Sequence, residues 1–308
     1  MADIVISEFM DEAVLRDAFA GCDILYDAKL VDRRDALFAA LADARALIVR
    51  NRTQVRAELL ERAPRLQVVG RLGVGLDNID LDQCRTRGIT VHAAQGANDV
   101  SVAEYVITSA LLLLRRAWSS TAAVAAGQWP RMEAIGREVA GKRIGLIGLG
   151  AIARETATRA RALGMTTAAH DPLLPADSAG WALAEPLTLQ QLLESSDVIS
   201  LHVPLTDATR RLIDASRLAS MKRGAILVNA ARGGVVDEAA VAASLHAGHL
   251  GGAALDVFET EPLTAEAARI FVGVPNLILT PHIAGVTDES NVRVSIVTAA
   301  AVLRSLRQ

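Results

Sequence analysis

A short glycine motif after an apolar run is the first feature of the sequence with a defined chemistry. Residues 143–147 are followed by GLGAIA at residues 148–153. Gly148 permits a tight turn, and Gly150 lets a diphosphate approach the backbone. A helix that begins near Ala151 would direct unpaired N–H groups at the same place. The motif predicts a nucleotide diphosphate here, with a purely structural strand-to-helix turn as the alternative.

An acidic residue follows this loop at the spacing that suits a ribose. Asp171 comes after the next apolar run, residues 166–169. A carboxylate there accepts hydrogen bonds from both ribose hydroxyls and repels a 2′-phosphate. Residues 172–176 contain no arginine or lysine that could bind such a phosphate. We therefore expect NAD rather than NADP, although Asp171 could instead serve an Asp-Pro turn.

Three later segments carry charged groups directly after apolar runs. They are residues 228–234, 256–262 and 280–285. Open parallel sheets bind ligands at the carboxyl ends of their strands, so we expect the three segments to lie at one edge of a sheet. Each segment alone could be an ordinary loop, but the occurrence of all three in this order is a specific signal for a functional site.

The elements that would position these loops follow an alternating pattern. Short aliphatic runs alternate with longer segments rich in Ala, Leu and Arg, which predicts parallel sheets covered by helices. The expected strands are residues 4–6, 46–49, 66–69, 90–91, 143–147, 166–169, 198–203, 225–229, 252–257 and 277–279.

Two longer helices are expected outside this alternation. One covers residues 101–127 and ends at Gly127 and Pro130, and the other covers residues 290–306. We expect chain crossings near Asn98 and Gly285 to separate two hinged domains with a cleft between them.

The composition is that of a globular protein. Of 308 residues, 51% are hydrophobic and 22% are charged, and the formal net charge of -3 offers no surface for nucleic acid. The start of the chain does not resemble a secretory signal and no run is long enough to span a membrane, so a cytoplasmic protein is expected. His246 and His249 lack a third ligand, and no metal is predicted.

The motifs together resemble those of the D-isomer-specific 2-hydroxyacid dehydrogenase family, in its 3-phosphoglycerate dehydrogenase branch. The resemblance covers nearly the whole chain and includes GRLGVGLDNID at residues 70–80 and LHVPLT at residues 201–206. It implies an α/β fold with two Rossmann-like doubly wound domains. A flavodoxin-like substrate domain, residues 1–97 plus 286–308, would contain an inserted NAD-binding domain, residues 98–285. Residues 101–127 would be a dimerisation helix in a homodimer.

The resemblance also assigns a catalytic set. Arg232 would clamp the substrate carboxylate through paired charge-assisted hydrogen bonds. His282 would take the hydroxyl proton as hydride leaves the substrate, and Glu261 would orient and charge-stabilise the histidine. Expected cofactor contacts are Gly148, Gly150, Ala151, Ile152, Asp171, Val203, Pro204, Thr209, Ala230, Ala231, Arg232, Asp256, His282 and Gly285. Expected substrate contacts are Arg50, Arg71, Leu72, Gly73, Val74, Gly75 and Arg232.

The substrate is then a small anionic 2-hydroxy acid. Arg50, Arg52 and Arg71 stand on loops of the first domain, where they could bind a second anion or simply be solvated. Residues 6–12 and 49–55 look most like the sulfolactate dehydrogenases of this family, which implies (S)-3-sulfolactate oxidised to 3-sulfopyruvate. D-3-phosphoglycerate, glycerate or hydroxypyruvate remain alternative substrates, and an NAD-sensing corepressor-like binding protein is a remote alternative.

Overall fold

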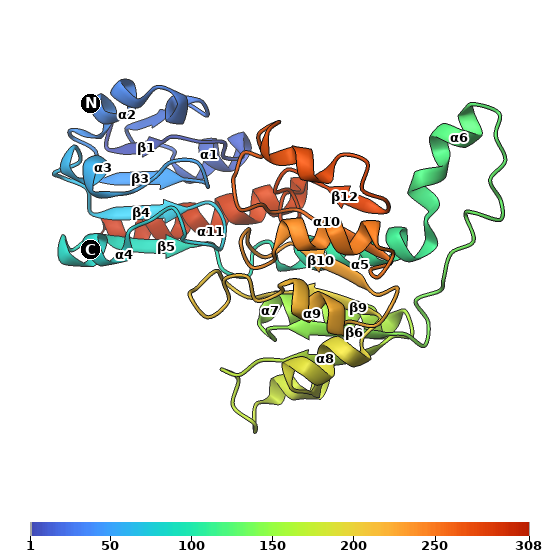
Figure 1. Ribbon diagram of the computed structural model, residues 1–308. Helices are drawn as coiled ribbons and strands as arrows, with labels where there is room; N and C mark the ends of the chain where they lie inside the picture. The colour runs from blue at the N-terminus through green and yellow to red at the C-terminus, as the bar shows by residue number, and fades with distance from the viewer. Residues whose placement is uncertain (1, 308) are drawn as a thin grey trace. The chain divides into compact units, whose positions relative to one another are not determined.

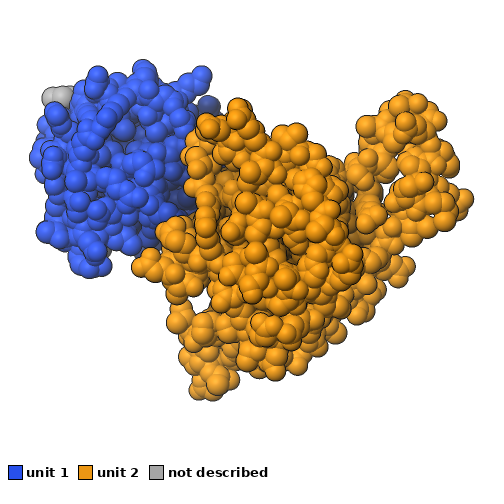
Figure 2. Space-filling view, viewed as in Figure 1, with its two compact units in different colours: residues 1–98, 286–308 blue, residues 99–285 orange. Residues whose placement is uncertain are grey.

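The computed structural model describes residues 2–307 and divides into two compact units. Unit 1 consists of Met1–Asn98 and Val286–Gln308, and unit 2 of Asp99–Gly285 (Figure 2). Each unit contains one parallel sheet covered by helices (Figure 1). The predicted α/β class with two Rossmann-like domains is therefore confirmed.

Unit 1 contains a five-stranded sheet in the order β2-β1-β3-β4-β5. Every neighbouring pair is parallel, and the order is that of a flavodoxin-like sheet. The strands are β1 (Ile4–Ile6), β2 (Ile24–Tyr26), β3 (Ala46–Val49), β4 (Val68–Arg71) and β5 (Thr90–Ala93). The helices are α1 (Glu12–Ala18), η1 (Leu30–Asp32), α2 (Arg34–Leu41), α3 (Ala57–Glu61), α4 (Leu81–Thr86) and α11 (Asp288–Leu306).

The two faces of this sheet bury alternate residues of each strand. In β3, Ala46 and Ile48 belong to the core beneath α1 and α11, whereas Leu47 and Val49 belong to the core beneath α2 and α3. Helix α11 lies very close to β4, because a Cβ added to Gly70 would stand 2.6 Å from a methyl carbon of Val302.

Unit 2 contains a seven-stranded parallel sheet in the order β12-β11-β10-β9-β6-β7-β8. The strand order reverses between β6 and β9, and such switch points are where nucleotides bind. The strands are β6 (Arg143–Ile147), β7 (Thr166–His170), β8 (Glu185–Pro186), β9 (Val198–Leu201), β10 (Ile226–Asn229), β11 (Gly252–Leu255) and β12 (Leu277–Leu279). The helices are α5 (Asp99–Arg115), η2 (Ala117–Ser120), α6 (Thr121–Ala125), α7 (Ala151–Ala162), η3 (Ala179–Leu183), α8 (Leu189–Ser195), α9 (Ala215–Ser220), α10 (Glu238–His246) and η4 (Ala267–Phe271).

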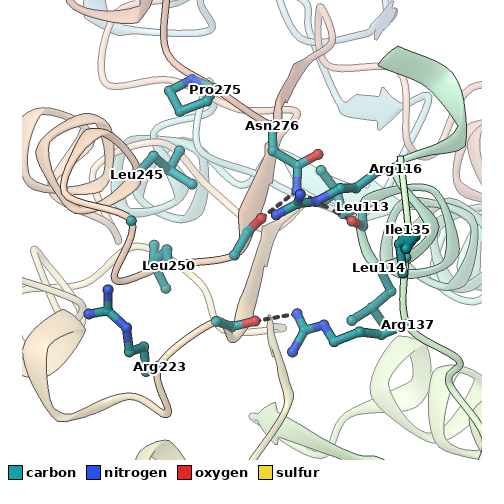
Figure 3. A pocket seen from close by; sticks show the side chains of 14 residues that line it. Leu113, Leu114, Arg116, Ile135, Arg137, Arg223, Leu245, Leu250, Pro275 and Asn276 are labelled. Atoms are coloured by element: carbon teal, nitrogen blue, oxygen red, sulfur yellow. Dashed lines mark hydrogen bonds between the residues drawn. The ribbon is translucent and has the colours of Figure 1, made fainter. Parts of the chain in front are cut away.

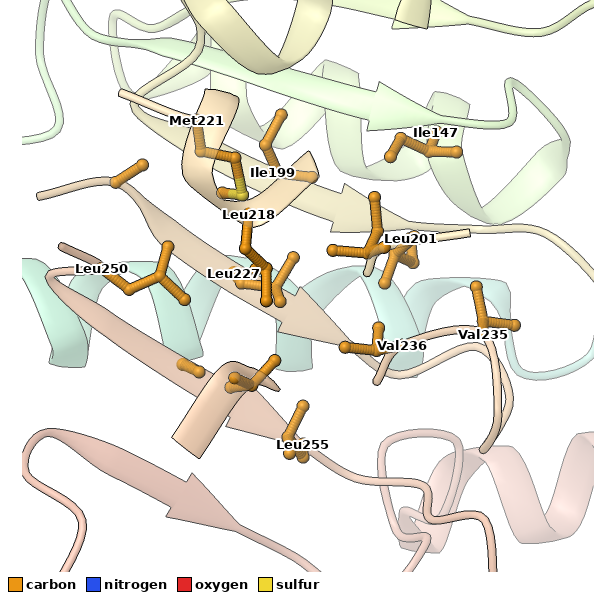
Figure 4. Close-up of a cluster of buried hydrophobic side chains, with 14 of the residues drawn as sticks. Ile147, Ile199, Leu201, Leu218, Met221, Leu227, Val235, Val236, Leu250 and Leu255 are labelled. Atoms are coloured by element: carbon orange, nitrogen blue, oxygen red, sulfur yellow. The ribbon is translucent and has the colours of Figure 1, made fainter. Parts of the chain in front are cut away.

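Alternation again assigns the residues of these strands to two cores. Leu227 of β10 and Leu255 of β11 pack with residues of α8, α9 and α10 (Figure 4). Ile226 and Val228 face the opposite core, which α5 and α7 complete. Strands buried on both faces hold their carboxyl-terminal loops in fixed positions.

The prediction of one helix over residues 101–127 is wrong. Helix α5 ends at Arg115, and Arg116 adopts a left-handed backbone with φ 52°. The chain returns past this helix end, where the Arg137 N–H donates to the Leu114 carbonyl at 2.8 Å. A Cβ on Gly136 would stand 2.6 Å from the Arg115 backbone. The returning segment thus caps α5, and residues 117–136 form a separate arm (Figure 1).

A pocket of about 400 Å³ lies at the base of this arm (Figure 3). Leu245 and Leu250 line it beside Arg137, which donates a hydrogen bond to the Gly224 carbonyl. Three of the lining residues, Gly224, Gly251 and Asn276, stand just before the first residues of β10, β11 and β12, respectively. The pocket is therefore at the edge of the sheet opposite the three charged loops.

Candidate active site

Arg232 stands in a tight turn directly after β10. Asn229 is buried and closes the turn, since its Oδ1 accepts from the Ala231 N–H at 3.1 Å and its Nδ2 donates to the Arg232 carbonyl at 3.0 Å. The Arg232 side chain is half-buried and donates from Nη1 to the Ala231 carbonyl at 2.5 Å. An amide at the end of a buried strand thus fixes the backbone that carries the guanidinium.

The loops after β10 and β11 are in direct backbone contact. A Cβ added to Gly233 would stand 1.8 Å from the Phe258 carbonyl oxygen, so only glycine fits. This approach brings Arg232 toward Glu261, and the positive charge of Arg232 is among the causes that lower the pKa of that carboxyl.

Glu261 and His282 form a hydrogen-bonded pair. The distance from His282 Nδ1 to Glu261 Oε2 is 2.7 Å, and Glu261 Oε1 accepts from the Phe258 N–H at 3.0 Å. Burial raises the pKa of Glu261, but the hydrogen bond and charge of His282, the hydrogen bond from the Phe258 N–H and the charge of Arg232 together outweigh it, and the net shift is downward. Glu261 is therefore a carboxylate near neutral pH, which sets Nδ1 as the protonated nitrogen and leaves Nε2 to exchange a proton with a ligand.

His282 is held in an unusual backbone conformation. Its φ is 57°, in the left-handed region that costs a non-glycine residue roughly 1–2 kcal/mol. Its N–H donates to the Asp256 carbonyl at 2.8 Å and to the Thr280 carbonyl at 3.0 Å. Strain of this kind persists where surrounding contacts over-determine it, and it is common at functional sites.

The glycine loop between β6 and α7 fits a dinucleotide. Gly148 has φ 89°, and a Cβ there would stand 2.7 Å from the His202 carbonyl oxygen. A Cβ on Gly150 would meet nothing within 4 Å, so the backbone there is open to a ligand. Gly150 is also the N-cap of α7 and supplies no side-chain cap, which leaves the N–H groups near Ala151 and Ile152 for a diphosphate.

Asp171 is fixed across from the same loop. Its Oδ2 accepts from the Leu149 N–H at 2.8 Å, and its Oδ1 accepts from the Leu173 N–H at 3.0 Å. The carboxylate is half-buried at the end of β7, where it can still accept from ribose hydroxyls. Backbone hydrogen bonds thus orient Asp171, the residue that the sequence predicts to favour NAD over NADP.

The other expected cofactor contacts lie at the carboxyl edge of the unit 2 sheet. The Thr209 hydroxyl is used within its own loop, where it donates to the Pro204 carbonyl at 2.6 Å. Asp256 is 1% exposed and its carboxylate holds the backbone of Ile283 and Ala284, so it acts on the loop of His282. Val203 and Pro204 follow β9, Ala230 and Ala231 follow β10, and Gly285 ends the segment after β12.

The expected substrate residues of unit 1 lie at the carboxyl ends of β3 and β4. The guanidinium of Arg71 folds over its own turn, donating from Nη1 to the Leu72 carbonyl at 3.1 Å and lying where a Cβ of Gly73 would stand. The Leu72 side chain is 2% exposed and belongs to the core, which leaves its backbone for a ligand. Val74 and Gly75 follow in the same turn and are half-buried.

Arg50 and Arg52 have different interaction partners in the structure. The Arg52 guanidinium forms an ion pair with Asp32, which already satisfies its charge. Arg50 donates from Nη2 to Asn291 Oδ1 at 2.7 Å, and its guanidinium carbon lies 5.7 Å from the centre of the Phe9 ring. Burial lowers the pKa of Arg50, with the Glu8 charge opposing that shift. Arg50 is the better candidate for a second anion.

Sequence reasoning missed the residues that hold Arg50 in place. Glu8 is 4% exposed and accepts from the N–H groups of Arg50, Arg52 and Thr53 at 2.8, 3.1 and 3.0 Å. Asn291 comes from α11, far away in the sequence. An acidic residue two positions after a buried strand is the one signal that could have indicated Glu8.

Among residues 2–307, no three His, Cys, Asp or Glu side chains are grouped as a metal site would require. The same described residues include no helix long and apolar enough to span a bilayer.

The comparison with family models identifies the class of protein. Residues 107–284 match the model for the D-isomer specific 2-hydroxyacid dehydrogenase, NAD binding domain. Because this match covers more than half of the chain, the chain belongs to the D-isomer-specific 2-hydroxyacid dehydrogenase family. The predicted family and the predicted cofactor NAD are thereby confirmed.

Individual relatives refine this assignment. The chain is 56% identical over 307 residues to an (S)-sulfolactate dehydrogenase of Chromohalobacter salexigens, covering 99% of both chains. It is 39% identical over 259 residues to a D-3-phosphoglycerate dehydrogenase of Bacillus subtilis, covering 84% of this chain and 49% of that one. A D-lactate dehydrogenase from Aquifex aeolicus, solved with NAD and lactic acid, superposes with a TM-score of 0.88 at 30% identity, covering 99% and 95% of the two chains.

Two glycine substitutions should separate folding from cofactor binding. Gly148→Ala introduces a Cβ at positive φ against the His202 carbonyl, so we expect the free energy of unfolding to fall by roughly 1–3 kcal/mol. Gly150→Ala adds a methyl group in open space, so stability should be unchanged while the Kd for NAD rises. Denaturant unfolding and calorimetric titration with NAD measure the two effects. Equal stability losses in both variants would contradict this assignment.

His202 should make the stability of the protein depend on pH. Burial lowers the pKa of His202 to about 4, well below its ordinary value of 6.5. Between these values the unfolded chain binds a proton that the folded chain does not, so stability is full above pH 6.5 and falls toward pH 4. The loss should be on the order of 3 kcal/mol. Denaturant unfolding from pH 7.5 to 4 should show a smaller decline in His202→Gln, and parallel curves would contradict the prediction.

Proposed function

We propose that the chain oxidises (S)-3-sulfolactate to 3-sulfopyruvate with NAD. The 56% identity over nearly the full length to a sulfolactate dehydrogenase carries this proposal. The guanidinium of Arg50, which donates to the uncharged side chain of Asn291, supports it, because a sulfonate needs a positive partner in addition to the clamp for the carboxylate.

The charged loops of unit 2 supply the chemistry of this reaction. When bound, NAD accepts the hydride that leaves C2 of the hydroxy acid. Arg232 holds the carboxylate through two parallel hydrogen bonds and so orients C2. His282 Nε2 takes the hydroxyl proton as the carbonyl forms, and Glu261 stabilises the resulting imidazolium through Nδ1. In the reverse reaction His282 returns the proton.

Turnover assays test the substrate. Purified protein is assayed for NADH formation with (S)-3-sulfolactate, D-3-phosphoglycerate and D-glycerate. We expect kcat/KM to be highest for sulfolactate, and Arg50→Leu should lower it for the two substrates that carry a second anionic group while leaving glycerate unaffected. A preference for D-3-phosphoglycerate would support the second candidate, which the 39% identity to a phosphoglycerate dehydrogenase favours. Uniformly negligible rates would contradict both.

We also propose that the chain forms a homodimer through the arm of residues 117–136. Five large apolar side chains of this arm are exposed: Trp118 (40%), Val124 (46%), Trp129 (79%), Met132 (71%) and Ile135 (63%). Such a concentration is typical of a surface covered by another subunit. In sedimentation velocity, Trp129→Ser should weaken the dimer, whereas Leu173→Ser, which alters a leucine that is 91% exposed outside the arm, should not. A monomeric native protein would contradict this proposal.

A cytoplasmic location is proposed as well. It agrees with two cysteines, Cys22 and Cys84, that are both free thiols. Separation of cytoplasm from cell envelope, followed by the dehydrogenase assay, tests this location, and activity in the envelope fraction would contradict it.

A further inference from the structure

A chain of side-chain hydrogen bonds connects α5 to the loop of His282 within unit 2. The phenol oxygen of Tyr105 lies 2.6 Å from Thr280 Oγ1. Thr280 Oγ1 in turn donates to Asp256 Oδ1 at 2.6 Å. Neither Tyr105 nor Thr280 belongs to the glycine loop or to the three catalytic positions.

The direction of the chain follows from the hydrogens available. A threonine hydroxyl has one proton, and a carboxylate can only accept. Thr280 therefore donates a hydrogen bond to Asp256 and accepts one from the Tyr105 hydroxyl. Burial raises the pKa of Tyr105, so the phenol keeps its proton near neutral pH. Tyr105 is thus the donor to Thr280, and its hydroxyl is also hydrogen-bonded with Ser109.

Asp256 transmits this hydrogen bonding to His282. Its Oδ1 accepts from the Ile283 N–H and its Oδ2 from the Ala284 N–H, both at 2.8 Å. Its carbonyl accepts from the His282 N–H at 2.8 Å. Three consecutive backbone N–H groups around the left-handed His282 therefore depend on one buried aspartate.

The carboxylate needs these donors because it is enclosed. Burial raises the pKa of Asp256, while the hydrogen bonds from Thr280, Ala284 and Ile283 and the charge of His282 oppose that increase. The charge of His282 lowers the pKa of Asp256, and the charge of Asp256 in turn raises the pKa of Tyr105. A protonated Asp256 would lose acceptor capacity for the loop.

We propose that Tyr105 is a positioning residue for His282, acting through Thr280 and Asp256. The inference rests on the proposed role of His282 as the acid/base. By donating to Thr280, Tyr105 supports the ionised form of Asp256, which fixes the backbone of residues 282–284. Tyr105 does not touch the substrate, so its loss should affect the orientation of the imidazole and the pH range of activity.

The test is Tyr105→Phe in the full chain. We expect kcat with (S)-3-sulfolactate to fall by roughly threefold to tenfold, with KM nearly unchanged. Removing the donor raises the pKa of Asp256, so the acid limb of the kcat profile should move to higher pH. The chain has one other tyrosine, Tyr26, whose hydroxyl donates to the Met10 carbonyl at 3.3 Å in unit 1. Tyr26→Phe is the matched control and should leave kcat and the pH profile unchanged.

Variants of Thr280 test the route. Thr280→Val should shift the acid limb of the kcat profile further than Tyr105→Phe does. Thr280→Ser keeps a hydroxyl at this position and should retain the native pH profile. Tyr105→Phe should add nothing to Thr280→Val, because both break the same chain. Additive effects, or a lower melting temperature with an unchanged pH profile, would overturn the proposal. If the native protein oxidises none of the three hydroxy acids, the proposed function fails instead, and the melting temperature of Tyr105→Phe against pH still reports on Asp256.

Discussion

Replacing His282 by asparagine should lower kcat for the hydroxy acid by roughly two to four orders of magnitude. Asparagine has no group that titrates near neutral pH, so no side chain takes the hydroxyl proton as the hydride departs. The choice of asparagine matters because His282 has φ 57°, and asparagine tolerates left-handed backbone better than alanine does. The variant should therefore fold normally and still bind NAD.

Steady-state kinetics and a melting curve together test this prediction. Glu261→Gln, which keeps a hydrogen-bonding partner near Nδ1 but removes its charge, should give an intermediate loss. Turnover within tenfold of the native value in His282→Asn would contradict the assignment of this histidine as proton carrier. A large fall in melting temperature would instead indicate damage to the loop.

Replacing Arg232 by lysine should lower kcat/KM by about two orders of magnitude although the positive charge remains. An ammonium cannot form the two parallel hydrogen bonds by which a guanidinium orients a carboxylate. The turn itself should survive, because Asn229 holds it through backbone groups that every residue possesses. Arg269→Lys is a matched control at an exposed position of the same unit.

Initial rates over a range of substrate concentrations measure this effect. The Kd for NAD should change less than kcat/KM, because Arg232 is only one of the expected cofactor contacts and the glycine loop that admits the diphosphate follows β6 rather than β10. Native kcat/KM in Arg232→Lys would show that a charge at this position is sufficient, and it would contradict the clamp.

Much of the fold could be predicted because buried parallel strands have a strong sequence pattern. The apolar stretches of Arg143–Ile147 and Ile226–Asn229, residues 144–147 and 226–228, are buried on both faces, and the sequence shows them directly. Strand β2 (Ile24–Tyr26) was missed, because this three-residue edge strand is half-exposed and has no such run. Strand β4 begins two residues later than expected, since the aliphatic run starts before the ladder does.

Contacts between distant residues could not be predicted from local pattern. Arg116 interrupts the expected long helix because Gly136 and Arg137 return to its end. Arg52 is paired with Asp32, which stands on a separate element. The sequence indicated that three charged loops share one edge, but not that Gly233 approaches the Phe258 backbone or that Glu261 pairs with His282, because each contact joins two different loops.

The division of unit 1 into two stretches of chain determines the order in which the protein can mature on the ribosome. Every residue of unit 2 is synthesised before α11, whereas the sheet of unit 1 must wait for that helix. Until Val294, Ala299 and Val302 emerge, the face of the sheet that contains Ile48 and Val68 is covered by α1 but not by α11. We infer that the nascent chain exposes apolar surface of the unit 1 sheet while unit 2 is already folded. Chaperone binding during translation should therefore concentrate on residues 1–98.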